Sequence, residues 1–229
     1  MPAESRRSGT ASGPATVEQV LHELDALRTP QGIPMGRIFA LAKAHMDLQP
    51  AGIEQLLDRP DHESRVVAVS VMDFQARDRR TPDARKQELF DLYLRRHDAI
   101  DTWDLVDRSA IWVVGEHLRD RPRDILDDLA ASPDPNRRRT AILATMAFIR
   151  HDELDDALRI AETLVDDQRD TVSKGVGWML REVGKRDEAR LRVFLDRHAA
   201  TMPRVSLRYA IEKLEPGLRA AYLARRTGA

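Results

Sequence analysis

The chain has 229 residues, of which 42 % are hydrophobic and 5 % aromatic, and its formal net charge is −1. This length fits one compact domain or one short repeat array, and the apolar content excludes a chain that is disordered throughout. The absence of cysteine excludes disulfides and thiolate metal sites and agrees with a reducing compartment. Because no run of eighteen apolar residues occurs, the sequence predicts no membrane-spanning segment.

The beginning of the chain differs in composition from the rest. Residues 1–15 are rich in Ser, Gly, Pro and Arg and lack the apolar stretch that a targeting segment needs. We therefore predict a disordered N-terminal tail over 1–15 and a single HEAT-like repeat domain over 16–229.

From residue 16 onwards the sequence has a helical period. Thr16 and Gln19 have the spacing of a capping box at the start of the first helix. The apolar residues of that helix recur at helical spacing, as Val20, Leu21, Leu24 and Leu27. Further helices are predicted at about 36–46, 50–58, 62–76, 82–96, 102–118, 122–131, 136–150, 153–166, 171–184, 187–200, 203–213 and 215–226. No segment alternates as a strand does, so the predicted fold is all-α.

The predicted helices form pairs that recur along the chain. Pairs cover 62–96, 102–131, 136–166 and 171–200, with a period of roughly 35–40 residues that is typical of HEAT-like arrays. Such a solenoid presents a concave face. Acidic residues outnumber basic ones by ten to four over residues 98–135, whereas basic residues prevail by thirteen to seven from 170 to the end. A basic concave face fits these counts, and so do ordinary solvated helices.

Several common enzyme motifs are absent from the sequence. There is no phosphate-binding Gly-rich loop followed by Lys, and the Gly175 to Gly177 pair lies within a helical pattern and not after a strand. No nucleophile elbow and no His pair at metal-binding spacing occurs. The sequence therefore predicts no metal site and disfavours a nucleophilic-serine enzyme.

The first candidate motif is Asp-Thr-Trp-Asp-Leu-Val-Asp over residues 101–107. Asp101 or Thr102 is placed to cap a helix. Trp103 and Asp107 are four residues apart and share one face of that helix. A tryptophan at the edge of the core beside a solvated aspartate would give the same pattern.

The second candidate is Asn-Arg-Arg-Arg over residues 136–139, at the predicted start of a helix. Positive charges there oppose the helix macrodipole, at a cost of a few tenths to about 1 kcal/mol each. A bound anion such as phosphate would offset this cost, so Arg138 and Arg139 are predicted to bind phosphate. A cluster held by Asp134 or by carboxylates of the preceding repeat is the alternative.

Two further basic patterns lie in the C-terminal third. One helical stripe combines a tryptophan with basic residues, namely Lys174, Trp178, Arg181 and Lys185. This combination suits a nucleic-acid backbone and a sugar or base face. Glycines at 175 and 177 would let a ligand or another helix approach closely. Arg204 and Arg208, again four apart, form the exposed basic face of a capping helix or contact DNA.

Three of these motifs, in order, resemble a known family. Trp-Asp-Leu-Val-Asp over 103–107, Arg-Arg-Thr-Ala-Ile-Leu over 138–143 and Lys-Gly-Val-Gly-Trp-Met-Leu-Arg-Glu over 174–182 resemble the AlkD-type DNA alkylation-repair glycosylases. The resemblance covers roughly residues 17–214. It implies a HEAT-like solenoid whose concave basic face holds duplex DNA, and a cytoplasmic, bacterial, monomeric protein that associates with the nucleoid through DNA.

The resemblance also implies an activity and residue roles. The family excises cationic alkylated purines such as 3-methyladenine and 7-methylguanine and needs no metal or organic cofactor. By resemblance, Asp107 is the catalytic aspartate, Trp103 and Trp178 contact the deoxyribose, and Arg139 lies near the lesion backbone. Asn136 departs from the aromatic residue that some members carry there. A non-catalytic DNA-binding solenoid and a protein-interaction scaffold remain the alternatives.

Overall fold

The computed structural model describes residues 15–225, and within this range it contains helices and no β-strand. The all-α prediction is therefore confirmed. The predicted tail lies outside the described residues except for Ala15, whose amide donates a hydrogen bond to Asp47. The last predicted helix is also present, although residues 226–229 are not described.

The helices have short connections and cover the predicted segments. In chain order they are α1 (Val17–Ala26), α2 (Met35–Ala44), α3 (Pro50–Leu57), α4 (His62–Arg77), α5 (Asp83–Arg95), η1 (His97–Ala99), α6 (Trp103–Ser109), η2 (Ala110–Gly115), α7 (Glu116–Leu118), α8 (Ile125–Ala130), α9 (Pro135–Ala144), α10 (Met146–Ile149), α11 (Asp155–Thr163), α12 (Asp170–Arg186), α13 (Glu188–His198), α14 (Arg204–Ala210) and α15 (Pro216–Ala224). Most boundaries differ from the predicted ones by one to three residues, the range over which helix ends fray.

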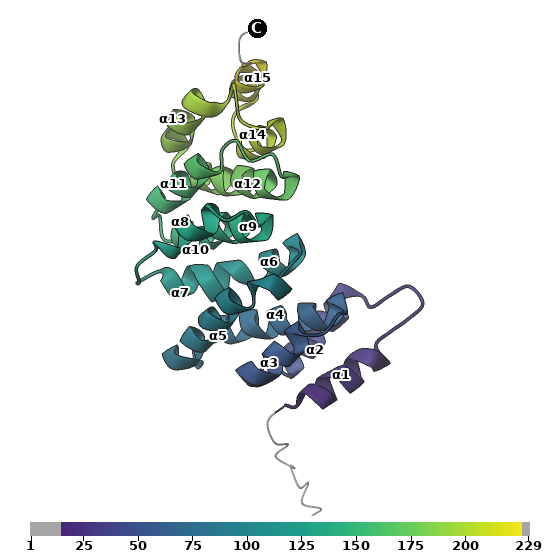
Figure 1. Ribbon diagram of the computed structural model, residues 1–229. Helices are drawn as coiled ribbons and strands as arrows, with labels where there is room; N and C mark the ends of the chain where they lie inside the picture. The colour runs from purple at the N-terminus through teal and green to yellow at the C-terminus, as the bar shows by residue number, and fades with distance from the viewer. Residues whose placement is uncertain (1–14, 226–229) are drawn as a thin grey trace, which may run out of the picture.

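The helices stack in two rows, which makes the protein a helical-repeat solenoid (Figure 1). One row runs through α2, α4, α6, α9, α12 and α14, each packed against the next. The other, which we call the outer row, contains α3, α5, α8, α11 and α13 and lies towards the left in Figure 1, while η2 with α7 continues α6, and α10 continues α9, in the first row. At the N-terminal end α1 projects towards the side of the first row, so the stack bends to that side. We call the first row the inner row.

Local sequence explains where several helices begin. The Thr16–Gln19 capping box is present, with both reciprocal hydrogen bonds formed. Asp61 and Asp134 cap α4 and α9 by accepting hydrogen bonds from backbone amides of the first turn. Asp134 therefore satisfies one of the free N–H groups at the start of α9 that an anion was predicted to bind. Pro135 occupies the first turn of α9, where its missing N–H costs no helical hydrogen bond.

Two predicted helices are irregular in the structure. The helix predicted over 102–118 consists of α6, a π-helical turn (η2) and α7, and the helix predicted over 136–150 is interrupted at Thr145. Side-chain hydroxyls compete with the backbone at both places: Ser109 donates to the carbonyl of Leu105, and Thr145 donates to the carbonyl of Ile142. The irregular turns lie against each other, because η2 packs on α9 and α10.

Gly115 makes this close approach possible. A Cβ at this position would lie 2.2 Å from the carbonyl oxygen of Ala144 and 2.9 Å from the Cβ of Ala147. We expect Gly115→Ala to lower the free energy of unfolding by about 1–3 kcal/mol, since backbone cannot yield as a flexible side chain does. Gly36 in α2 has nothing within 4 Å of the corresponding position and serves as the control.

Denaturant unfolding of both variants checks this prediction. Gly36→Ala should leave stability unchanged or raise it by up to about 1 kcal/mol, because alanine favours the helix. Equal stability of Gly115→Ala and the wild type would contradict the close packing of η2 on α9 and α10.

Candidate functional site

Asp107 is held by a two-point ion pair in the middle of the inner row. The Arg139 guanidinium of α9 donates from Nε to one Asp107 oxygen at 2.7 Å and from Nη2 to the other at 2.8 Å. The Arg139 side chain is 6 % exposed, whereas the Asp107 side chain is 26 % exposed. The carboxylate is therefore fixed in orientation while part of it stays open to solvent.

Arg139 also connects α9 to α12. Its Nη1 donates to the backbone carbonyl of Thr171 in the first turn of α12. One turn later, Gly175 leaves space for this side chain, since a Cβ there would lie 3.4 Å from Nη1 of Arg139 and 3.3 Å from Ile142. One guanidinium thus joins α6, α9 and α12, and we call these contacts of Arg139 the Arg139 clasp.

The two predicted tryptophans lie on the helices that the clasp joins. Trp103 is the first residue of α6, one turn before Asp107, and is 54 % exposed. Trp178 lies on α12 on the same helical row as Thr171 and Gly175, which face Arg139. It is half-buried and packs against the core. Asp107 and both aromatic residues therefore belong to neighbouring helices of the inner row.

Further polar contacts tie the N-terminal ends of the inner helices together. The Asn136 side-chain amide at the start of α9 donates to the carbonyl of Asp101, and Arg65 of α4 pairs with the Asp101 carboxylate at 2.7 Å. His62 of α4 lies 2.8 Å from Asp104 of α6. These contacts give Asn136 a structural partner at the position where the sequence departs from the resembling family.

A buried hydrogen-bonded cluster lies directly beneath the site. The hydroxyl of Thr140, next to Arg139, is 2.9 Å from the Tyr93 hydroxyl and 2.9 Å from Nε2 of His97. All three side chains are fully buried. Burial raises the pKa of Tyr93, and burial followed by the positive charge of Arg137 lowers the pKa of His97 to about 4. Both groups are therefore neutral at pH 7, and they hold the α9 turn that carries Arg139.

The lowered pKa of His97 makes stability depend on pH. An unfolded histidine titrates near pH 6.5 and the folded His97 near 4, so the unfolded chain binds the extra proton between these values. We expect the free energy of unfolding to fall as pH drops from about 6.5 to about 4, by on the order of 3 kcal/mol, and to lose nothing more through this group at lower pH. His97→Gln should flatten this part of a stability-against-pH curve, and an unchanged slope would contradict the assignment.

Arg138, predicted to bind phosphate, is bonded within the protein. Its guanidinium pairs with Asp167 and donates at 2.9 Å to the carbonyls of Ser132 and Pro133. The cation is thus held by a carboxylate of the next repeat and not by Asp134 or the preceding one.

The basic residues of the α12 stripe each have a carboxylate partner. These pairs are Lys174 with Asp170, Arg181 with Glu212, and Lys185 with Glu182. The Lys174 and Lys185 side chains are 43 % exposed, but that of Arg181 is only 19 % exposed. The lysines are therefore the more available to a phosphate, because an exposed ion pair is weak and easily exchanged.

The two predicted arginines of α14 differ in availability. Arg204 donates to the carbonyls of Leu223 and Arg225 and so anchors the end of α15. Arg208 is exposed, and its side chain forms no hydrogen bond or ion pair with another described residue. Tyr209, which the sequence interpretation did not single out, is 37 % exposed, and its Cβ would be 2.6 Å from a Cβ at Gly177. Gly177 therefore serves close packing of α12 on α14, and brings Tyr209 beside the α12 stripe.

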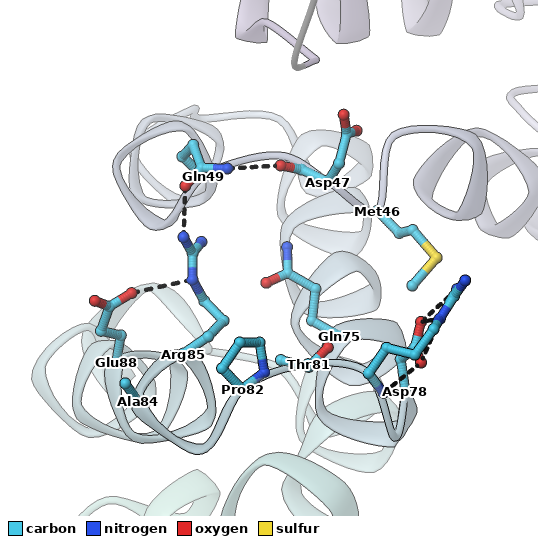
Figure 2. Close-up of a pocket in the computed structure, with 11 residues that line it drawn as sticks. Met46, Asp47, Gln49, Gln75, Asp78, Thr81, Pro82, Ala84, Arg85 and Glu88 are labelled. Carbon is cyan, nitrogen blue, oxygen red and sulfur yellow. Dashed lines mark hydrogen bonds and ion pairs between the residues drawn. The ribbon is translucent and has the colours of Figure 1, made fainter.

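The cavity shown in Figure 2 lies elsewhere. It has a volume of about 680 Å³ and is lined by residues from the α2–α3 connection, from the end of α4, from the α4–α5 connection and from α5. Its arginines are already paired, Arg85 with Glu88 and Gln49, and Arg80 with Asp78. None of the predicted site residues lines it.

No group of His, Asp and Glu side chains over residues 15–225 could hold a metal ion. No helix in the same range is long and apolar enough to cross a membrane.

Fold and site together define a class: a helical-repeat solenoid with a clasped carboxylate and exposed aromatics on its inner row. The model of the DNA alkylation repair enzyme family matches residues 26–214, and the chain belongs to this family. No curated protein matches the chain significantly. Among solved structures, a predicted DNA alkylation repair enzyme from Enterococcus faecalis has a TM-score of 0.62 and 14 % identity, covering 90 % of this chain and 97 % of its own. That likeness supports the fold, and the family supports an enzymatic role in DNA repair.

Proposed function

We propose that this protein is a monomeric DNA glycosylase with a HEAT-like fold, which hydrolyses the N-glycosidic bond of cationic alkylated purines in duplex DNA. The observation that carries the proposal is the Asp107 carboxylate, fixed by Arg139, partly open to solvent and one turn from the exposed Trp103. Family membership supports alkylated DNA as the substrate. 3-Methyladenine and 7-methylguanine are the expected lesions.

Departure of the base requires little assistance from the protein. An N-alkylated purine carries a positive charge and departs as a neutral base, so no strong general acid is required. Positive charge then develops on the deoxyribose as an oxocarbenium ion. Asp107 would stabilise this charge and orient the attacking water, as preorganised electrostatic groups do in other enzymes.

The aromatic residues and Arg139 have complementary roles in the proposal. Trp103 and Trp178 would present electron-rich ring faces to the cationic sugar, which contributes about 0.5–2 kcal/mol each. Arg139 uses both Asp107 oxygens and the Thr171 carbonyl, so it acts here mainly by orienting the carboxylate. A carboxylate has about four acceptor positions, and two remain for water or the sugar.

We propose that the predicted basic residues bind DNA phosphates, and that the more exposed side chains do so more readily. Arg208, Lys174 and Lys185 are the most exposed and would contact phosphate directly. Arg138, Arg181 and Arg204 would have to exchange an internal partner first. Such phosphate contacts fix the register of the duplex and carry no base specificity.

Incubation of the protein with methylated duplex DNA, followed by analysis of released bases, tests the proposal. Release of 7-methylguanine or 3-methyladenine by the wild type without added metal would support it. Intact methylated DNA after incubation with folded protein that binds DNA would overturn it.

Intact methylated DNA, bound by folded protein, would favour a second candidate function, that of a DNA-binding solenoid without catalysis. Both oxygens of Asp107 already accept hydrogen bonds from Arg139, which is also what a purely structural ion pair would show. Binding without any salt dependence would instead point to a protein-interaction scaffold, because phosphate contacts make affinity fall steeply with salt.

A further inference from the structure

A second group of arginines lies on the inner row, beyond the proposed catalytic site. Arg77 ends α4, Arg150 follows α10, and their guanidinium carbons lie 5.0 and 5.1 Å from the ring centroid of Trp112 in η2. Arg108 of α6 joins them through Asp73, which pairs with both Arg77 and Arg108. We call Arg77, Trp112 and Arg150 the tryptophan–arginine cluster.

The cluster reaches the surface of the protein, since the side chains of Arg77 and Arg150 are exposed and that of Trp112 is half-buried. Arg108 reaches across α4 to stack on Phe39 of α2 and on Phe74, with centroid distances of 4.6 and 4.7 Å. Arg108 thus lies between α2, α4 and α6. Arg77 lies one turn after Asp73, on the same side of α4.

Arg139 lies in α9, and Arg150 directly follows α10, which continues α9 beyond the interruption at Thr145. The two residues are eleven positions apart, which corresponds to roughly 16 Å along an α-helix. Duplex DNA carries one negative charge per about 1.7 Å of its axis. A duplex that extends from Asp107 towards the end of α10 would therefore place phosphates at the cluster.

The cluster has more positive charge than its carboxylate can balance. The arginines at 77, 108 and 150 share the single buried Asp73, and no carboxylate of the described residues lies within 4 Å of Arg150. Glu116 and Glu182 act on Arg150 from farther away and are already paired, with Arg119 and Lys185 respectively. Burial, followed by the charge of Arg77, lowers the pKa of Arg150, so an added anion would relieve repulsion.

We propose that the tryptophan–arginine cluster is a second anchor for the DNA backbone, which binds a phosphodiester through Arg77 and Arg150. Trp112 positions both guanidinium groups by cation–π stacking. The N–H groups of Arg150, and those of Arg77 that do not bond to Asp73, are then available to phosphate oxygens. This inference rests on the proposed function only in taking DNA as the ligand.

Salt-dependent binding of a short undamaged DNA duplex, measured by fluorescence anisotropy, tests the inference. Arg150→Gln removes a charge that has no close carboxylate partner among the described residues. It should weaken binding several-fold and reduce the slope of log affinity against log salt by about 1. Arg150→Lys keeps the charge and should keep the wild-type slope.

Arg192 of α13, in the outer row, provides the matched control. Its side chain is 49 % exposed, and its guanidinium lies 4.0 Å from the Glu188 carboxylate. Arg192→Gln therefore removes one surface charge, as Arg150→Gln does. Its slope should equal that of the wild type, and melting temperatures should show that all variants are folded. A wild-type slope for Arg150→Gln, or an equal reduction for Arg192→Gln, would overturn the inference. Base release by the wild type is measured separately, so the glycosylase proposal can fail while this anchor stands.

Discussion

Replacing Asp107 with asparagine is expected to slow release of 7-methylguanine by a factor of about 10²–10³, or roughly 3–4 kcal/mol in the activation barrier. Asparagine keeps the size of the side chain and can still hold a water, but it removes the negative charge facing the sugar. Its amide group would also oppose the Arg139 guanidinium, which now donates to both carboxylate oxygens. Single-turnover release from methylated duplex DNA measures the effect.

Asp101 provides the matched control for this substitution. It lies at the start of the same helix and also pairs with an arginine, Arg65, but it is two residues before Trp103 and outside the clasp. Asp101→Asn should leave the rate within a few-fold of the wild type. Affinity of Asp107→Asn for undamaged DNA should be unchanged or higher, since a carboxylate near the phosphates is gone. Equal release rates for Asp107→Asn and the wild type would remove Asp107 from the mechanism.

Arg139→Ala is expected to affect both stability and rate. It leaves a partly buried carboxylate and the Thr171 carbonyl without their donor. Breaking a fully buried pair costs about 3–5 kcal/mol, and because Asp107 is partly exposed we expect about 2 kcal/mol here. The release rate should fall by about tenfold or more, since the carboxylate loses its fixed orientation.

Arg139→Lys separates orientation from charge. Lysine keeps the positive charge but cannot bond both carboxylate oxygens in one plane, so it should restore most of the stability and little of the rate. Arg65→Ala, which removes the partner of Asp101, is the control and should leave the rate unchanged. Full activity of Arg139→Lys would show that charge alone suffices and that the two-point contact has no catalytic role.

The sequence predicted the helices well because their signals are local. The Thr16–Gln19 capping box and the apolar spacing that follows it depend on residues within one or two turns. The shared face of Trp103 and Asp107 follows from their spacing in the same way. The π-helical turn could not be predicted, since it depends on how η2 packs against Ala144 in the next repeat.

The sequence could not predict which carboxylates pair with the predicted cations. Arg138 and Arg139 are neighbours in the chain, yet one pairs with Asp167 and the other with Asp107, 29 and 32 residues away in opposite directions. Which carboxylate each reaches depends on the stacking of successive repeats. Tyr209 was missed for a related reason, because its exposure depends on how closely α14 approaches Gly177.

The Arg139 clasp has a mechanical consequence for the whole solenoid. In a stacked array each repeat contacts mainly its neighbours, so the array bends where the contacts between layers are weakest. Arg139 spans three successive inner helices, α6, α9 and α12, and therefore stiffens the middle of the array. We expect the layers that Arg139 does not join to take up more of any bending needed to follow a curved or deformed duplex. The proposed catalytic carboxylate would then keep its position while the rest of the array adapts.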